Sequence, residues 1–154
     1  MEKIIRYASE KDFDVLRDMY LHDVEDHEQR AKKFAEDLIF RLKTIICETN
    51  GKIIGNISWD TRGGLNDGVI ELIGLGISQN YRRKGVAEEL VLTLIDEAKD
   101  FFKVGGYKLR VIYFFMERQN KGGRAFYKHM GFREVSIVPA FYPNDDAIVW
   151  IKYF

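Results

Sequence analysis

The sequence predicts an α/β fold, a mixed β-sheet with at least one parallel βαβ crossover. Its 154 residues suit a single domain of ordinary size. Residues 69–78 form a nearly continuous apolar run, which is typical of a strand buried on both faces. A long amphipathic segment at 85–103 follows directly, and a second strand-like run at 109–116 comes after it. This strand–helix–strand order indicates a parallel pair joined by a helix.

The chain is expected to begin with a short strand, at residues 4–7, followed by two helices. Ser9 and Asp12 have the spacing of a helix capping box, with Asp in place of the usual Glu. Apolar residues then recur at helical spacing. The first helix carries Phe13, Leu16, Met19 and Tyr20, and the second carries Phe34, Leu38, Ile39 and Leu42. A polar and acidic segment, residues 22–28, separates the two helices.

A β-hairpin is expected after the second helix. Asn50 and Gly51 both tolerate positive φ, and they stand between strand-like segments at 44–48 and 53–59. Residues 60–68 are rich in Gly, Asn and Asp, so they predict a loop before the buried strand.

The second half of the chain alternates between helices and strands. The helix at 85–103 has a continuous apolar stripe. The elements after it are a strand at 109–116, a short helix at 124–130, and strands at 132–138 and 147–154. The last two strands are expected to pair antiparallel across a loop at 139–146.

Composition excludes several classes of function. Lys+Arg and Asp+Glu both number 24, and this zero net charge argues against a dedicated nucleic-acid binder. The single cysteine, Cys47, rules out a disulfide within the chain and a zinc site built on several cysteines. The N-terminus lacks an apolar signal segment, and no apolar run approaches the ~20 residues of a membrane span. We therefore expect a cytoplasmic protein with no metal and with neither nucleic acid nor membrane as a partner.

A basic loop connects the buried strand to the long helix. Arg82, Arg83 and Lys84 place three positive charges at the helix start, where backbone amides lack intrahelical partners and the dipole favours an anion. Gly85 allows a close backbone approach, and the small Ala87 leaves the first turn uncrowded. These features predict a seat for a phosphate or pyrophosphate group, with a solvated basic turn as the alternative.

Two motifs in the chain resemble those of a known family. Arg82-x-x-Gly85-x-Ala87 matches the Gln/Arg-x-x-Gly-x-Gly/Ala signature of the GNAT superfamily of N-acetyltransferases. The family's second motif, Asn-x6-Tyr-x3-Gly-Phe, is matched by Asn120, Tyr127, Gly131 and Phe132. The chain departs from the family at Gly123, where an Ala is usual.

This resemblance implies a fold and a reaction. It implies one N-acetyltransferase domain over residues 1–154, with a central mixed sheet of about seven strands, four flanking helices, and parallel strands that splay apart at the cofactor site. It also implies acetyl-CoA as co-substrate, no metal, and direct attack on the thioester by a primary amine. A homodimer is left open.

The resemblance further implies which residues hold acetyl-CoA. The backbone amides of Leu75 and Ile77 would bind the pantetheine arm and the thioester carbonyl. The pyrophosphate would lie on the loop and first helical turn, at Arg82, Arg83, Lys84, Gly85, Val86 and Ala87. Asn120 would bind the pantetheine or simply cap a helix. Gly74 and Gly76 indicate a bulge or a close approach to the ligand, or else they only relieve crowding in a buried strand.

Two residues are candidates for proton transfer. Tyr127 occupies the family position that donates a proton to the leaving thiolate; its alternative role is to anchor the short helix in the core. Glu71 is the candidate base by resemblance, because it lies six residues before Ile77, where the histone-acetylating branch of the family carries its glutamate base. A carboxylate in an apolar strand is costly unless paired, and desolvation would raise its pKa. A structural or substrate-positioning role for Glu71, with a water chain as base, is the alternative.

The acceptor is less well defined by the sequence. Residues 141–147 resemble a stretch of protein N-terminal acetyltransferases, in which aromatic side chains line a slot for the first residues of the substrate. The acceptor is thus expected to be a protein or peptide N-terminus, or a small amine such as a polyamine. The acidic residues within 22–28 would attract a cationic acceptor, or only solvate a turn. A catalytically silent acyl-CoA sensor or protein-docking module is the competing class.

Overall fold

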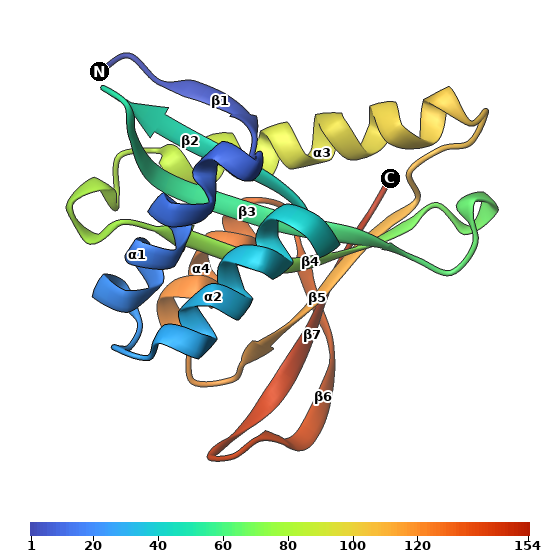
Figure 1. Ribbon diagram of the computed structural model, residues 1–154. Coiled ribbons are helices and arrows are strands. Elements are labelled where there is room, and N and C mark those ends of the chain that lie inside the picture. The colour runs from blue at the N-terminus through green and yellow to red at the C-terminus, as the bar shows by residue number, and fades with distance from the viewer. The chain divides into compact units, whose positions relative to one another are not determined.

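The computed structural model describes residues 1–154 and has the mixed sheet that the sequence predicts. The seven strands follow the order β1-β2-β3-β4-β5-β7-β6, and four helices accompany them (Figure 1). The strands are β1 (Ile4–Tyr7), β2 (Lys43–Thr49), β3 (Lys52–Arg62), β4 (Val69–Ile77), β5 (Val111–Glu117), β6 (Arg133–Tyr142) and β7 (Asp145–Tyr153). The helices are α1 (Phe13–Asp23), α2 (Glu28–Glu36), α3 (Val86–Val104) and α4 (Lys121–His129).

The local signals in the sequence produce the expected turns. Asn50 and Gly51 adopt positive φ, 50° and 73°, and close the β2–β3 hairpin. The backbone amide of Ser9 donates to the Asp12 carboxylate at 2.8 Å, as a capping box requires, and one 3-10 turn leads into α1. The helix containing Phe34 continues past α2 as a short π-helical segment, Asp37–Arg41.

Both predicted loops turn out to be shorter than expected. β3 continues to Arg62, so only six residues separate it from β4, and a 3-10 turn occupies Leu65–Asp67. β6 extends to Tyr142 and β7 begins at Asp145, so a two-residue connection takes the place of the loop at 139–146. Pro139 does not end β6 because β6 is an edge strand whose pairing with β7 is irregular between Val138 and Tyr142, so the missing N–H interrupts no regular ladder there.

The expectation that the strand at 69–78 is buried on both faces is wrong: burial alternates in its first half, where Val69 and Glu71 are partly exposed, and is lost in its second half. Ile70 and Leu72 are buried, but Ile73 is 40 % exposed and the residues after it are partly exposed. The parallel ladder to β5 runs from Val69↔Val111 to Glu71↔Tyr113, which is short for strands of nine and seven residues. The second half of β4 therefore has surface available for contacts other than a packed core.

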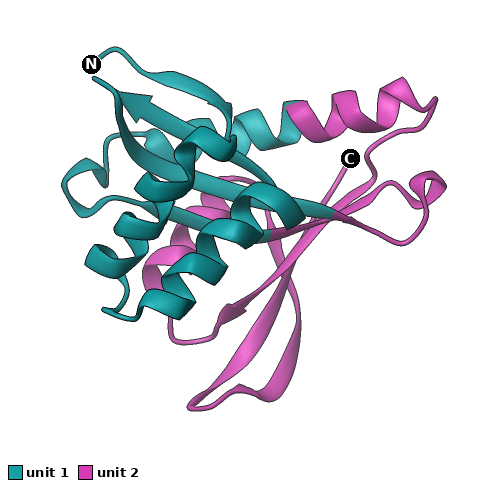
Figure 2. Ribbon diagram, in the orientation of Figure 1, with its two compact units in different colours: residues 1–60, 73–96 teal, residues 61–72, 97–154 magenta.

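The chain forms two compact units, coloured separately in Figure 2. The first comprises residues 1–60 and 73–96. In this unit α1 and α2 lie against one face of β2 and β3, and the start of α3 packs against the other (Figure 1). Its core on the α1–α2 side contains Leu16, Ala35, Leu38, Ile46 and Ile53.

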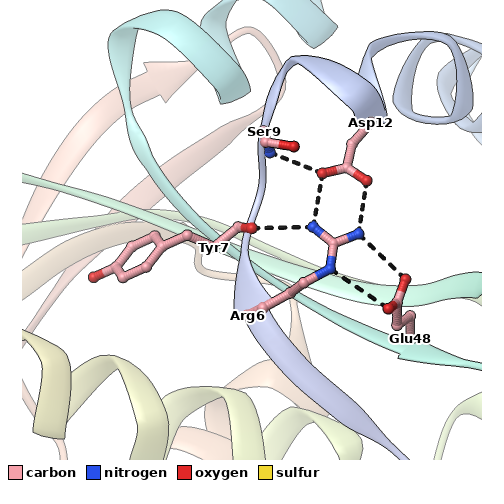
Figure 3. Close-up of polar contacts among 5 residues, drawn as sticks. All are labelled: Arg6, Tyr7, Ser9, Asp12 and Glu48. Atoms are coloured by element: carbon pink, nitrogen blue, oxygen red, sulfur yellow. Dashed lines mark hydrogen bonds and ion pairs between the residues drawn. The ribbon is translucent and has the colours of Figure 1, made fainter.

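A partly buried ion-pair network fixes the start of α1 to the sheet in the first unit (Figure 3). The Arg6 guanidinium of β1 donates to both carboxylate oxygens of Asp12 at 2.9 Å, and to Glu48 of β2 at 3.2 Å. The hydrogen bonds from Arg6 hold the pKa of Asp12 below its usual range, and those to Asp12 and Glu48 raise the pKa of Arg6. Because α1 follows Asp12 immediately, this network sets where α1 lies on β2.

The second unit comprises residues 61–72 and 97–154. β7 pairs antiparallel with both β5 and β6. Aromatic side chains from β5, α4 and β7 form its core, in which the ring centroids of Phe114 and Tyr127 are 4.3 Å apart and the fully buried Trp150 stacks parallel to Phe114. None of the chain's helices is both long enough and apolar enough to cross a membrane.

Candidate active site

A cavity of about 450 Å³ lies within the first unit. Residues from α1 and α2 form one wall, and Asn56 and Ser58 of β3 form another. The exposed half of β4, Ile73–Ile77, runs along it, and Arg82 of the following loop completes it. The cavity therefore joins the predicted phosphate loop to the second half of β4.

Gly74 and Gly76 expose the backbone of β4 to this cavity. A Cβ added at Gly74 would meet nothing within 4 Å, and one added at Gly76 would meet only the Asn56 amide nitrogen, at 3.6 Å. The two glycines therefore do not relieve crowding in the strand, which was one of the two interpretations of the sequence. Their effect is to leave the backbone around Leu75 free of side chains on a cavity wall, which suits close approach by an extended ligand.

The loop between β4 and α3 has the geometry of an anion seat. Arg83 and Gly85 have positive φ, 58° and 81°, and a Cβ at Gly85 would meet nothing within 4 Å. The first hydrogen bond of α3 runs from the Glu89 amide to the Gly85 carbonyl at 3.1 Å, so the amides just before Glu89 lack partners from an earlier helical turn. Arg82, Arg83 and Lys84 are all exposed around this helix start.

Two contacts position this loop. The Arg82 Nε donates to the carbonyl of Ile77 at 3.1 Å, which ties the loop to the end of β4. Gly55 of β3 allows the start of α3 to approach, because a Cβ there would lie only 2.9 Å from Ile77 Cδ1 and 3.2 Å from Val86 Cγ1. Val86 is buried in this contact, whereas Ala87 is partly exposed on the first turn.

Glu71 lies in the second unit and is paired. Its carboxylate is 2.7 Å from the Arg62 guanidinium and accepts a hydrogen bond from the Tyr113 hydroxyl at 3.3 Å. Its side chain is 21 % exposed. The extension of β3 to Arg62 therefore supplies the partner that a carboxylate in an apolar strand needs. The roles of base and of substrate positioning both stay predictions.

Tyr127 lies on α4 among the aromatic side chains of the second unit. It is 7 % exposed, and its ring contacts those of Phe114, Phe126, Phe132 and Trp150. Burial raises the pKa of its phenol well above the ordinary value. The hydroxyl is therefore protonated at neutral pH, and the ring also anchors α4 in the core.

Asn120 is the N-cap of α4. Its side-chain oxygen accepts a hydrogen bond from the Gly123 amide at 2.9 Å, which confirms the capping alternative; contact with pantetheine stays a prediction. A Cβ at position 123 would lie 2.6 Å from Met116 Sδ and 2.8 Å from the Asn120 amide nitrogen. Glycine therefore accommodates this cap where the family usually has alanine.

Two of the four acidic residues within 22–28, Asp23 and Glu25, are paired with neighbouring side chains. Glu25 accepts hydrogen bonds from Arg30 at 2.6 Å and from the Tyr20 hydroxyl at 2.5 Å, and these bonds lower the pKa of Glu25 to about 2. Asp23, which lines the cavity, lies 2.8 Å from His22 Nδ1. Cys47 is fully buried, and desolvation raises the pKa of its thiol.

Comparison with known proteins identifies the family. Residues 13–132 match the model of the acetyltransferase (GNAT) family. The chain belongs to the GNAT family. Among curated relatives, an uncharacterized N-acetyltransferase of Methanocaldococcus jannaschii is 30 % identical over 96 residues, which are 60 % of this chain and 40 % of that protein. A second from the same organism is 27 % identical over 158 aligned positions, covering 97 % of this chain and 90 % of the relative.

Solved GNAT structures share the fold over nearly the whole chain. The ribosomal-protein-S18-alanine N-acetyltransferase of Escherichia coli has a TM-score of 0.77 at 21 % identity, covering 99 % of this chain and 94 % of its own. Ard1 of Thermoplasma volcanium has a TM-score of 0.79 at 15 % identity, covering 99 % of this chain and 98 % of its own. The expected GNAT fold of seven strands and four helices, with the parallel β4–β5 pair, is confirmed.

The structure gathers only some of the predicted GNAT site residues. Leu75, Ile77 and Arg82 line one cavity, and the loop to Ala87 continues from it. The others lie in the second unit, at Glu71, Asn120 and Tyr127.

The sequence reasoning missed Asn56 on the cavity wall and Arg62 beside Glu71. Asn56 and Ser58 interrupt the apolar run of β3 at alternate positions, and this period-two pattern was an available signal.

Proposed function

We propose that this chain is an acetyl-CoA-dependent N-acetyltransferase that transfers the acetyl group directly to a primary amine. The observation that carries the proposal is the loop at Gly85. There the backbone has a positive φ, the space around Gly85 is open, and α3 begins. The loop follows the glycine-containing half of β4 that forms one wall of the cavity. A pyrophosphate needs these amides and this unobstructed approach. Membership of the GNAT family supports the same ligand.

In the proposed reaction the neutral amine attacks the thioester carbonyl carbon, and the carbon–sulfur bond then breaks. The amides of Leu75 and Ile77 bind the pantetheine arm and stabilise the developing oxyanion. Tyr127 donates its phenolic proton to the departing thiolate, since a tyrosine phenol is protonated at neutral pH and can act as the acid. The attacking nitrogen loses its proton to a base or to water.

Glu71 is proposed to position the acceptor and not to accept its proton. The Arg62 guanidinium at 2.7 Å and the Tyr113 hydroxyl at 3.3 Å fix the position of this carboxylate, which suits a positioning role. A water chain then removes the proton. A direct base role for Glu71 remains the alternative, and the two roles predict different pH profiles.

A peptide N-terminus is the acceptor that we favour. Structural neighbours include the S18-alanine N-acetyltransferase and Ard1, although at this identity they speak for the fold alone. In the segment 141–147, Phe141 is 51 % exposed and stacks on Phe115, with centroids 5.1 Å apart, and Tyr142 packs edge-on against Phe141. Exposed, rigid aromatic rings suit contact with the first residues of a peptide.

Thiol release from acetyl-CoA in the presence of a panel of amines tests this function. The panel should contain short peptides with varied N-termini, polyamines and free amino acids, and an assay without acceptor corrects for hydrolysis. Turnover with peptides is expected. Binding of acetyl-CoA without turnover on any amine would favour the alternative, a catalytically silent sensor or docking module.

A further inference from the structure

Asn56 presents a carboxamide to the cavity from the middle of β3. The preceding residue, Gly55, faces α3, because a Cβ added to Gly55 would lie 3.1 Å from Leu90. Side chains alternate between the two faces of a strand, so Asn56 points to the opposite face. Asn56 is only 6 % exposed, yet it lines the cavity. Its amide nitrogen is 3.6 Å from the position that a Cβ on Gly76 would occupy, which places it beside the bare part of β4.

No hydrogen bond joins this carboxamide to another protein group, and its polar atoms remain accessible from the cavity. An asparagine side chain offers two N–H donors and one acceptor oxygen, and buried groups of this kind are nearly always satisfied. Ser58, on the same face of the strand, illustrates the usual situation, since its hydroxyl lies 2.9 Å from that of Thr44. Asn56 is therefore expected to complete its hydrogen bonds with a molecule that occupies the cavity.

The surroundings narrow the chemistry of that molecule. Most side chains on the wall opposite β3 are apolar: Met19, Val24, Phe34, Leu38 and Leu42. The carboxylate of Asp37 is engaged by Lys33 and Arg41. A carboxamide can donate to a carbonyl and accept from an N–H at the same time, so it matches a peptide group. A simple alkylamine has only its reacting nitrogen, whose lone pair must face the thioester, so it offers the carboxamide no acceptor.

We infer that Asn56 is a specificity-determining residue that hydrogen-bonds the peptide group next to the reacting amine of the acceptor. The inference rests on the proposed acetyltransferase function. It adds the reason why the enzyme would prefer a peptide to a plain amine, namely the hydrogen bond from Asn56 to the peptide group. The apolar wall then receives the side chain of the first residue.

Two acceptors and two variants test this role. The acceptors are a short peptide with an N-terminal alanine and a primary alkylamine of similar size, and the measured quantity is the ratio of their kcat/KM values. Asn56→Leu and Asn56→Ala should each lower this ratio roughly 10–100-fold, mainly through KM for the peptide, with KM for acetyl-CoA unchanged. Asn66→Leu, an exposed asparagine in the β3–β4 connection, is the matched control and should leave the ratio unchanged.

Thermal unfolding provides a readout that does not depend on turnover. Because the Asn56 carboxamide makes no hydrogen bond within the protein, Asn56→Leu should leave the Tm close to that of the wild type. A lowered Tm with equal losses on both acceptors would show that Asn56 is structural and would overturn the inference. So would a raised KM for acetyl-CoA, which would assign Asn56 to the co-substrate. A wild type that acetylates no amine would refute the proposed function itself, and with it this inference.

Discussion

Replacing Asp12 by asparagine should loosen α1 from the sheet by a measurable amount. The change keeps the size of the side chain and one acceptor oxygen but removes the charge that receives two Arg6 hydrogen bonds at 2.9 Å. The Asp12 side chain is 8 % exposed, whereas Arg6 is 37 % exposed and keeps Glu48 as a partner. Hydrogen bonds to charged groups contribute about 1.5–3 kcal/mol, and the exposure of Arg6 places this loss near 2 kcal/mol. For a chain of this length that corresponds to a Tm lower by roughly 4–8 °C.

The assay is thermal or urea unfolding of the wild type and Asp12→Asn as a function of pH. The pKa of Asp12 is lower in the folded protein than its usual value of 3.8. The contribution of Asp12 to the free energy of unfolding is therefore complete above pH 3.8 and is lost as pH falls through the folded pKa. The stability difference should therefore be constant between about pH 5 and 7 and shrink below about pH 4. Asp14→Asn is the control, since that side chain is 78 % exposed and should change stability by less than about 0.5 kcal/mol. Equal stability of Asp12→Asn and wild type at pH 7, or a gap that persists in acid, would refute this reasoning.

Three further predictions concern catalysis. Tyr127→Phe keeps the ring packing but removes the proton donor, so kcat should fall roughly 10²–10⁴-fold with little change in acetyl-CoA affinity in a binding titration; full activity would exclude the phenol as the acid. Glu71→Gln should raise KM for the amine and leave the acidic limb of the kcat/KM profile in place, whereas loss of that limb would show that Glu71 is the base. Gly74→Val adds a side chain whose Cβ would meet no protein atom within 4 Å, so Tm should be retained while acetyl-CoA turnover is lost, and an active variant would remove β4 from the binding site.

The fold could be predicted from the sequence because its signals are local. Asn50-Gly51 defines a hairpin whatever the rest of the chain does, and the long stripe of α3 identifies a helix without reference to its partner. The ends of β3 and β6 were misjudged because strand length depends on pairing with a neighbour. Pro139 indicates a break in a central strand but is tolerated in β6, and only the strand order reveals that β6 is at the edge.

The candidate site was predictable where chemistry follows from consecutive residues. Arg82 to Ala87 could be located from the motif alone, and Gly74 and Gly76 could be singled out but not interpreted. Whether those glycines relieve crowding or expose backbone depends on what surrounds them, and the surrounding space is a tertiary property. The pairing of Glu71 with Arg62 likewise brings together residues from two different strands.

The central claim is that the Gly85 loop binds the pyrophosphate of acetyl-CoA, and calorimetric titration with acetyl-CoA of wild type, Gly85→Ala and Gly85→Glu tests it most directly. Both substitutions strain the backbone equally, because Gly85 has a φ of 81°, so they should lower Tm by similar amounts. Only glutamate adds bulk and negative charge where the phosphates would lie. We predict that Gly85→Ala still binds acetyl-CoA, more weakly than wild type, and that the folded Gly85→Glu protein shows no binding. Wild-type affinity in Gly85→Glu would contradict the account.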